Sequence, residues 1–259
     1  MEKKLIQSVE RAVQILQSFS LKEDHIGVTD LSRRLGLNKS TVFGILTTLR
    51  HFRLVEKVPE TGHYKLGIKL LELGNLVFSQ LDIRKIARPY IDVIVEKYSE
   101  TMHLAILDGQ EIVYVDKVDS DRSICMNSSV GKRMPTYCTG VGKIILANLP
   151  GDTWKEHVPK DLVRVTANTI TRMEDLEKEI ERIRRSGYSE DNEEVEQGLS
   201  CVAVPIFDND NQVIAGISLS APTIRMPKEK ARIIADELIQ TAAEISQKMG
   251  SRRITSIDA

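Results

Sequence analysis

The sequence is poor in the features that mark secreted and membrane-spanning proteins. Its three cysteines, Cys125, Cys138 and Cys201, are scattered and odd in number, which argues against a disulfide framework and suits reduced thiols. No apolar run reaches the roughly eighteen residues that a transmembrane helix needs, and the first residues, Met-Glu-Lys-Lys-Leu, lack the apolar core of a signal peptide. We therefore expect a cytoplasmic protein that makes no use of a membrane.

The motifs of common enzymes are also missing. Gly140-Val-Gly-Lys143 is similar to part of a phosphate-binding loop, but Tyr137 stands where the first glycine belongs and Ile144 replaces the required Ser or Thr. There is no nucleophile elbow and no His-x-x-x-His pair, and the five histidines lack metal-ligand spacing. We therefore expect neither a catalytic role nor a cofactor.

The overall composition is that of an ordinary globular protein, but the charge is unevenly distributed. The chain of 259 residues is 41% hydrophobic and 28% charged, with a net charge of −1. Residues 1–80 carry twelve Lys and Arg against eight Asp and Glu. A basic part joined to an acidic remainder is typical of a DNA-binding module attached to a separate sensing module.

Residues 30–49 predict two short helices separated at Gly36. Gly36 can end the first helix in the left-handed conformation, and Asn38 can cap the second. The second helix carries an apolar stripe at helical spacing, formed by Val42, Ile45, Leu46 and Leu49. Such a stripe indicates a helix that packs one face on a core.

The opposite face of the second helix has small hydroxyls, one cation and no acid. Its residues are Lys39, Ser40, Thr41, Phe43, Gly44, Thr47 and Thr48. This chemistry suits a helix lying in the major groove of DNA, with Arg33 of the preceding helix beside it. A helix pair that faces the core of an ordinary domain is the alternative.

The residues on both sides of these helices favour the DNA-binding interpretation. Residues 8–20 predict a preceding helix, and the alternating segments 54–58 and 63–66, joined by Pro59-Glu-Thr-Gly62, predict a hairpin. Three helices followed by a hairpin form a winged helix-turn-helix over residues 1–65. The wing would place three residues against a phosphate or in the minor groove, namely Lys57, His63 and Lys65.

The rest of the chain predicts a linker helix and an α+β domain. Residues 66–81 are apolar on much of the helix circumference, so we expect this linker helix to pair with a partner subunit or pack on both domains. The second domain, 82–250, precedes a polar tail, 251–259. Its predicted helices are 83–98, interrupted at Pro89, 140–149, 173–186 and 227–249. Its predicted hairpins are 102–118 and 201–220, with a strand at 124–129 and an irregular loop at 131–135. This order suggests a mostly antiparallel sheet with helices on its faces.

Several motifs in the right order resemble the IclR family of bacterial transcription factors over essentially the full length. The C-terminal signature is Gly187-x3-Asp191-x2-Glu194-x6-Cys201-Val-Ala-x2-Ile206-Phe-Asp208. The segments Leu37-Asn-Lys-Ser-Thr-Val42 and Thr139-Gly-Val-Gly-Lys-Ile-Ile-Leu-Ala147 also match. Within the family, Glu100-Thr-Met-His-Leu104 and Gly216-Ile-Ser-Leu-Ser220 look closest to the KdgR-like branch, which represses pectin and ketodeoxygluconate use.

The resemblance implies a winged helix-turn-helix, a linker helix and a GAF-like effector domain, assembled as a dimer or a dimer of dimers. It also implies a pocket for a small metabolite, in this family mostly a carboxylate. The effector-binding residues carried over by the resemblance are Ser123, Met126, Met134, Gly140, Val141, Asp191, Leu199, Cys201, Ser218 and Ser220. The sequence departs from many relatives at Gly44, where they carry a larger polar or basic side chain, so the operator sequence stays open.

The implied pocket is chemically coherent. Ser218 and Ser220 stand two apart on a strand, so both hydroxyls face the same side of the sheet. Gly140 and Val141 open a helix whose free amides favour an anion. Asp191 can accept a hydrogen bond from a ligand hydroxyl, and the methionines and the leucine would form an apolar wall.

Each pocket residue also has a plain structural interpretation. The two serines can be ordinary sheet residues, the methionines core, and Cys201 a buried small hydrophobe. The acidic run 189–196 has the composition of a solvated surface, and His103 is either a hydrogen-bonded interior residue or part of the pocket. A metal site is a further alternative, and it requires the convergence of Cys138, Cys201 and His103.

Together these features predict a DNA-binding transcriptional repressor controlled by a carboxylate or sugar acid such as ketodeoxygluconate. The expected partners are double-stranded operator DNA, the effector and further copies of the chain. The alternatives are an activator of the same family that senses an aromatic or other small organic acid, and an architectural DNA binder that senses nothing. The length of the second domain argues against the architectural binder, because DNA anchoring alone does not require such a domain.

Overall fold

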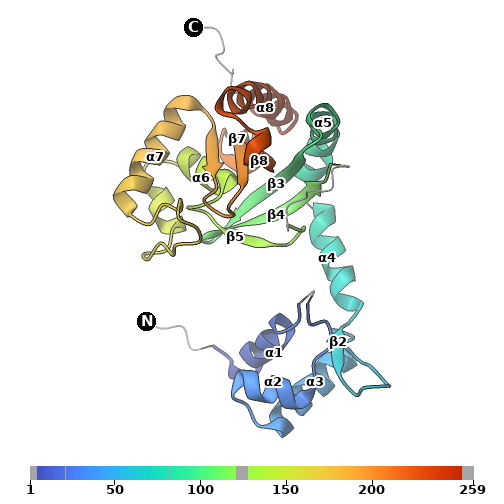
Figure 1. The fold of residues 1–259 in the computed structure, drawn as a ribbon. Helices are drawn as coiled ribbons and strands as arrows, with labels where there is room; N and C mark the ends of the chain where they lie inside the picture. Colours follow the sequence, from blue (N-terminus) through green and yellow to red (C-terminus); the bar gives the residue numbers. More distant parts are fainter. Residues whose placement is uncertain (1–4, 21, 81, 121–127, 253–259) are drawn as a thin grey trace. The chain divides into compact units, whose positions relative to one another are not determined.

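The computed structural model describes residues 5–20, 22–80, 82–120 and 128–252. The chain divides into two compact units, residues 1–81 and 82–259. Figure 1 shows a mainly helical N-terminal unit and a C-terminal unit built on a sheet. Among the described residues, no helix combines the length and the apolar character needed to cross a membrane.

The N-terminal unit is a winged helix-turn-helix, as predicted. It consists of α1 (Gln7–Gln17), α2 (Val28–Leu35), α3 (Lys39–His51), the hairpin β1 (Val55–Lys57) and β2 (Tyr64–Leu66), and α4 (Lys69–Gln80). The three helices and the hairpin enclose one apolar core, which includes Ile15, Leu31, Val42, Leu46 and Tyr64.

The turn between α2 and α3 has the predicted glycine geometry. Gly36 has φ +63°, in the left-handed region, and its N–H donates to the Ser32 carbonyl. Asn38 occupies the N-cap position of α3, but its side chain makes no capping hydrogen bond. The prediction for Gly36 is therefore confirmed, whereas the predicted capping contact of Asn38 is absent.

The connection from the wing to α4 depends on Gly67. A Cβ atom at this position would lie 2.1 Å from the Arg53 carbonyl oxygen, and the Gly67 N–H donates to the Leu54 carbonyl at 2.9 Å. Only glycine allows this close approach. Leu66 belongs to β2, so it cannot begin the helix as predicted. Helix α4 begins three residues later, at Lys69.

The C-terminal unit contains a six-stranded antiparallel sheet with the strand order β5-β4-β3-β8-β7-β6. Its strands are β3 (Thr101–Asp108), β4 (Glu111–Val118), β5 (Arg133–Pro135), β6 (Ser189–Asn192), β7 (Leu199–Phe207) and β8 (Val213–Pro222). Helices α5 (Asp82–Tyr98) and α8 (Lys228–Lys248) pack together on one face of this sheet. Helix α6 (Gly140–Asn148) lies on the other face, and α7 (Met173–Ser186) packs against α6 (Figure 1). The predicted α+β architecture is confirmed.

Some local predictions for this unit are wrong. Pro89 lies inside an uninterrupted α5, whose buried residues Ala87 and Ile91 anchor it on both sides of the proline. Strand β5 forms within the segment expected to be an irregular loop, because Arg133–Pro135 pairs with β4. Most of the strand expected at 124–129 lies outside the described residues.

The acidic run 189–196 had two interpretations, a pocket residue at Asp191 and a solvated surface. The solvated-surface alternative fails for part of the run, because Ser189–Asn192 pairs with β7 as strand β6. Pairing directs alternate side chains inward, so Ser189 and Asp191 are buried, and Glu194 beyond the strand is buried as well. This strand brings acidic side chains next to α6.

Candidate effector pocket and nucleic-acid interface

The face of the sheet under α6 carries a continuous row of polar side chains. Directly paired residues of an antiparallel sheet point to the same side. The strand register pairs Asp191 with Cys201 and Cys201 with Ser220, and it pairs Ser218 with His103. The sheet therefore places a carboxyl, a thiol, two hydroxyls and an imidazole on one surface.

A small cavity lies between this polar row and the start of α6. Its lining consists of Tyr114, Thr139, Gly140, Val141, Asp191, Val195, Cys201, Ser218 and Ser220. The cavity volume is about 10 Å³, which is room for about one water molecule. A larger guest therefore requires the surrounding side chains to move apart.

The structure brings together six of the residues expected at the effector site: Gly140, Val141, Asp191, Cys201, Ser218 and Ser220. Leu199 and Met134 lie on β7 and β5 and are not part of the lining. Ser123 and Met126 lie outside the described residues.

Sequence reasoning missed three residues that line the cavity, Tyr114, Thr139 and Val195. A threonine directly before the helical Gly140 is an N-cap signal that would have found Thr139. Nothing in the sequence pattern marked Tyr114 or Val195.

Thr139 fixes the start of α6 at the cavity. Its Oγ1 accepts the Gly142 N–H at 3.1 Å and donates to the Pro135 carbonyl at 3.0 Å. A Cβ atom at Gly142 would lie 2.2 Å from the Thr136 carbonyl oxygen, so the helix approaches the preceding segment as closely as only glycine allows. The positive end of the helix macrodipole therefore faces the cavity, where it favours an anion.

Asp191 is the acidic group of the cavity, and it is 3% exposed. Burial raises the pKa of Asp191 to about 7; the nearby Lys143 opposes this shift and Glu194 adds to it. The backbone N–H of Glu194 donates to Asp191 Oδ1 at 2.8 Å. The carboxyl is therefore held in place by the segment that follows β6.

Lys143 and Glu194 form a buried ion pair beside the cavity. Lys143 Nζ also lies 3.8 Å from Glu179 Oε1 of α7. Burial raises the pKa of Glu194, while Lys143 lowers it. The side chain of Lys143, in the first turn of α6, thus extends toward α7 and toward the segment that follows β6.

His103 lies next to the lining, in the interior of the unit. Its Nε2 is 2.8 Å from Ser128 Oγ, and its Nδ1 is 3.5 Å from Ser220 Oγ. Burial lowers the pKa of His103 to about 3, with Lys117 contributing, so the imidazole is neutral. The structure thus shows a hydrogen-bonded interior histidine that contacts the pocket through Ser220.

The two described cysteines are buried thiols. Burial raises the pKa of Cys138 to about 12, and burial raises the pKa of Cys201 as well. Ser220 Oγ donates to Cys201 Sγ at 3.0 Å. Within the described ranges, no three His, Cys, Asp or Glu side chains form a group that could hold a metal ion.

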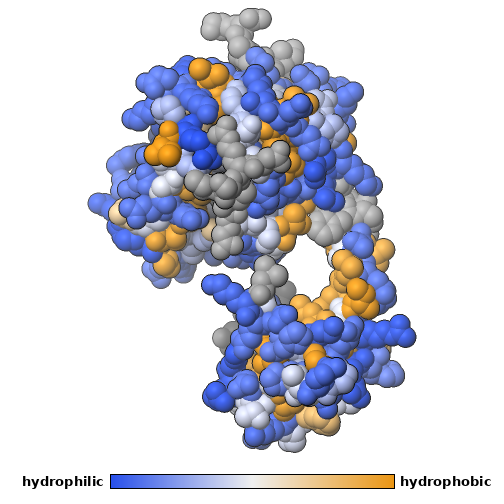
Figure 2. All heavy atoms as spheres, turned by 45° about the vertical axis from the view of Figure 1, so that its right-hand side comes forward, coloured by the Kyte–Doolittle hydropathy of each residue, from blue (hydrophilic) through white to orange (hydrophobic). Residues whose placement is uncertain are grey.

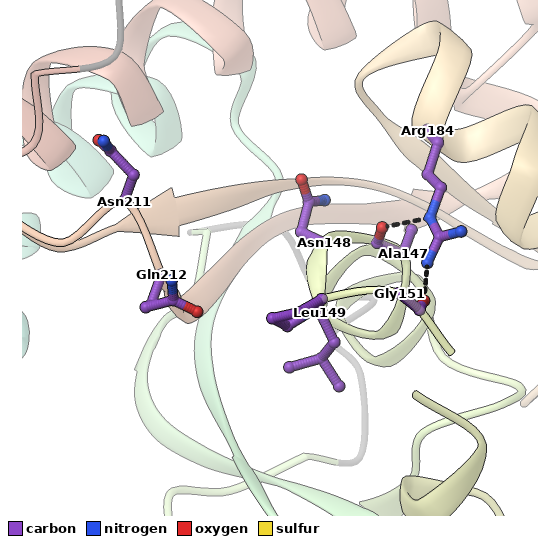
Figure 3. A pocket seen from close by; sticks show the side chains of 8 residues that line it. Ala147, Asn148, Leu149, Gly151, Arg184, Asn211 and Gln212 are labelled. Atoms are coloured by element: carbon purple, nitrogen blue, oxygen red, sulfur yellow. Dashed lines mark hydrogen bonds between the residues drawn. The ribbon is translucent and has the colours of Figure 1, made fainter. Parts of the chain in front are cut away.

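A larger hollow of about 430 Å³ lies at the opposite end of α6, next to the β7–β8 turn (Figure 3). Its arginine, Arg184 of α7, donates to the Ala147 carbonyl at 2.8 Å and to the Gly151 carbonyl at 2.7 Å. A cation on the last carbonyls of a helix stabilises that helix end. Arg184 therefore caps α6, and its position has a structural explanation.

The N-terminal unit presents the predicted face of α3 to solvent. Lys39, Ser40, Phe43, Gly44, Thr47 and Thr48 are exposed, and Thr41 is half-buried. Thr47 Oγ1 donates to the Phe43 carbonyl at 2.8 Å, and Thr48 Oγ1 donates to the Gly44 carbonyl at 3.1 Å. The hydroxyl hydrogens are thus used within the helix, which leaves the oxygen lone pairs and the methyl groups to face outward.

The predicted DNA-contacting cations differ in their surroundings. Lys39 and Lys57 are exposed and form no ion pair within the described part of the chain. Lys65 pairs with Glu56 at 3.3 Å, and Arg33 pairs with Asp30 at 3.1 Å. His63 is half-buried, and a Cβ atom at Gly27 would lie 3.2 Å from its Nε2. The last turn of α3 adds two exposed basic residues that the sequence analysis did not select, Arg50 and His51.

Several apolar side chains of helix α4 are exposed to solvent. Leu71 is 58% exposed, Leu76 60% and Val77 60%. Figure 2 shows this apolar surface in orange along the helix. A helix face of this kind marks an interaction surface.

Comparisons with known proteins agree with this two-unit organisation. The family model for the C-terminal domain of the bacterial transcriptional regulator IclR matches residues 75–247, and the IclR helix-turn-helix model matches residues 8–59. The HTH-type transcriptional regulator KdgR of Escherichia coli (strain K12) is 38% identical over 246 residues, which cover 95% of this chain and 93% of that protein. The regulator XynR of the same organism is 36% identical over 248 residues, covering 95% and 98%.

A solved structure shows the same fold. The crystal structure of the Thermotoga maritima IclR has a TM-score of 0.77 and 35% sequence identity, and the match covers 94% of this chain and 99% of that one. These relatives are transcriptional regulators, which confirms the prediction that the chain is not an enzyme. The chain belongs to the IclR family of bacterial transcriptional regulators and binds DNA through its helix-turn-helix domain.

Proposed function

We propose that the protein is a repressor whose affinity for its operator is controlled by a small carboxylate, such as the sugar acid ketodeoxygluconate. The observation that carries this proposal is the cavity at the start of α6, which combines a helix N-terminus, two serine hydroxyls and a carboxyl group. YiaJ of Escherichia coli (strain K12), a DNA-binding transcriptional repressor, is 30% identical over 249 residues, which supports the choice of a repressor. The resemblance to the KdgR-like branch supports the choice of a sugar acid.

The groups in the pocket suit the two ends of a sugar acid. The ligand carboxylate would accept from the first amides of α6, at Gly140 and Val141. Hydroxyls farther along the ligand would bond to Ser218 and Ser220. Because the present cavity holds about one water molecule, binding requires the lining side chains to move apart. The segment 131–139, which ends at the lining residue Thr139, would then close over the ligand.

The DNA side of the proposal uses two copies of the chain. The exposed apolar side chains of α4 suit pairing with a second copy, and two recognition helices would then enter successive major grooves about 34–36 Å apart. Lys39 of α3 and Lys57 of the wing would contact phosphates. We place this dimer, or a dimer of dimers, in the cytoplasm with its DNA.

The effector can change operator binding only if the dimer has two arrangements of its DNA-binding units and the effector binds one arrangement more tightly than the other. The test measures the affinity of the full chain for a duplex of its own upstream region, by fluorescence anisotropy, with and without saturating ketodeoxygluconate, pyruvate and 4-hydroxybenzoate. We expect one acid to weaken binding at least tenfold.

The matched control is the double variant Ser218→Ala with Ser220→Ala, which should keep basal DNA binding and lose the response. Equal affinity with every acid would remove the sensing role and leave an architectural DNA binder.

A further inference from the structure

The ionisable groups in and beside the cavity include more acids than bases, and two of them are only partly buried: the side chain of Arg182 is 37% exposed and that of Glu179 is 18% exposed. Glu179, Glu194 and Asp191 lie close to Lys143 and Arg182. Arg182 donates to both oxygens of Glu179 at 2.8 Å. Lys143 is paired with Glu194. Both cations are therefore committed to the two glutamates.

Asp191 is the carboxyl left without a cation. It forms no ion pair within the described part of the chain, and its Oδ1 accepts a hydrogen bond from a backbone amide, the N–H of Glu194, at 2.8 Å. With all five groups ionised, the cluster would carry one uncompensated negative charge, and it would lie on a side chain that is 3% exposed. An uncompensated buried charge is costly, and protonation of the carboxyl removes it.

The other groups around Asp191 do not supply the missing positive charge. On β7 and β4, burial raises the pKa values of Cys201 and Tyr114 above their ordinary range, so both stay protonated and neutral. Cys138, which precedes α6, is also a neutral thiol. His103 of β3 is neutral because burial lowers its pKa to about 3. Among the described residues that line the cavity, Asp191 is the only carboxyl and none is a base.

A carboxylate ligand therefore meets a second carboxyl group in the same small cavity. Asp191 lies next to the start of α6, because a Cβ atom at Gly140 would lie 3.8 Å from Asp191 Cβ and both residues line the cavity. Two carboxylates that share one site cannot both stay ionised, and they share a proton instead.

We propose that the effector binds in this pocket together with one proton, which Asp191 holds and donates toward the ligand carboxylate. This inference rests on the proposed function, because it assumes a carboxylate effector. The proton comes from solvent and resides on the Asp191 oxygen that does not accept the Glu194 N–H. The amides of α6 and the protonated carboxyl then donate to opposite sides of the ligand carboxylate.

Burial raises the pKa of Asp191 to about 7, which supports the assignment, since the carboxyl then gains its proton easily near neutral pH. Above pH 7, each increase of one pH unit should raise the Kd of the ligand about tenfold, because the proton taken up on binding becomes ten times scarcer in solution. Below about pH 6 the carboxyl is already protonated, and binding should take up no proton.

The test is isothermal titration calorimetry of the full chain with ketodeoxygluconate at pH 8, in phosphate and in Tris, whose ionisation enthalpies differ. The expected result is an uptake of about one proton per bound ligand at pH 8, falling toward zero at pH 6. The variant Asp191→Asn should remove both the uptake and the pH dependence of Kd. The control Ser218→Ala should weaken binding and keep the uptake.

Binding of the acid at pH 8 without proton uptake by the unaltered protein would overturn the inference and leave the proposed function standing. Uptake that persists in Asp191→Asn would also overturn it, because another group would then hold the proton. If ketodeoxygluconate gives no heat, pyruvate and 4-hydroxybenzoate are titrated in the same way. Failure of all three acids to bind would overturn the carboxylate-sensing function itself, and the inference with it.

Discussion

Lys143 and Glu194 form an ion pair inside the effector-binding unit, with side chains that are 1% and 8% exposed. Lys143 belongs to the first turn of α6, and Glu194 belongs to the segment whose backbone amide holds Asp191. The pair therefore links α6 to the segment that follows β6.

Breaking this pair should destabilise the C-terminal unit strongly. Lys143→Met leaves the Glu194 carboxylate buried without its cation, and the expected loss is about 3–5 kcal/mol of unfolding free energy. The double variant Lys143→Met with Glu194→Gln should recover much of that loss, because no unpaired charge remains. Urea unfolding followed by circular dichroism measures both values.

The matched control for this prediction is Lys155→Ala. Lys155 pairs with Glu177 at 2.6 Å, but both side chains are more than 40% exposed, so the change should cost little compared with the loss of the buried pair. If the Lys143 variant were no less stable than the Lys155 variant, the buried pair would contribute nothing to the fold.

Asp191 should make the protein less stable as the pH rises. Burial raises its pKa in the folded protein from 3.8 to about 7, so between these values the folded state binds more protons than the unfolded state. The unfolding free energy contributed by this group is then fully present below about pH 4 and is lost as the pH rises through about 7. Asp191→Asn should flatten this part of the stability curve, which thermal unfolding between pH 4 and 8 would show. A steeper decline in the variant would contradict the assignment.

The sequence predicted the elements whose signal is local. The turn at Gly36 and the apolar face of α3 were predictable because each depends on residues that are close together in the sequence. The alternation of side chains along β7 and β8 likewise shows which residues of a strand share a face. The position of Asp191 does not follow in this way, because the run around it has the composition of a solvated surface. Only the pairing of β6 with β7 turns it inward, and strand pairing between distant segments leaves no mark on the run itself.

The glycines of α6 and α4 should respond oppositely to the same substitution. At Gly142 an added methyl group would clash with the Thr136 carbonyl and the capping Thr139 hydroxyl, so Gly142→Ala should destabilise the unit and abolish the ligand response. At Gly74 a Cβ atom meets nothing within 4 Å, so Gly74→Ala should stabilise α4 by about 1 kcal/mol. Unfolding free energies of the two variants test this contrast. A loss of stability in Gly74→Ala would indicate that a second copy packs closely at this position.

Two lysines of the N-terminal unit should contribute differently to the salt dependence of DNA binding. Lys39 has no acidic partner within the described part of the chain, whereas Lys65 is paired with Glu56 at 3.3 Å. Lys39→Ala should lower the slope of log K against log salt by about 0.9 for each phosphate that the lysine neutralises, and Lys65→Ala should lower it less. Anisotropy titrations over a range of salt concentrations measure both slopes. Equal slopes for Lys39→Ala and the unaltered protein would show that Lys39 binds no phosphate.

Thr47 should read the operator through its methyl group rather than through its hydroxyl hydrogen. The hydroxyl donates to the Phe43 carbonyl at 2.8 Å, and a methyl group in the major groove can contact the methyl group of thymine. Thr47→Val keeps the methyl group and should preserve operator preference, whereas Thr47→Ser removes it and should weaken binding to the preferred operator by about fourfold, the effect of about 0.8 kcal/mol for one buried carbon. Competition between operator variants with thymine and with uracil at single positions measures the preference. If Thr47→Val lost the preference and Thr47→Ser kept it, the hydroxyl oxygen would be the group that reads the base.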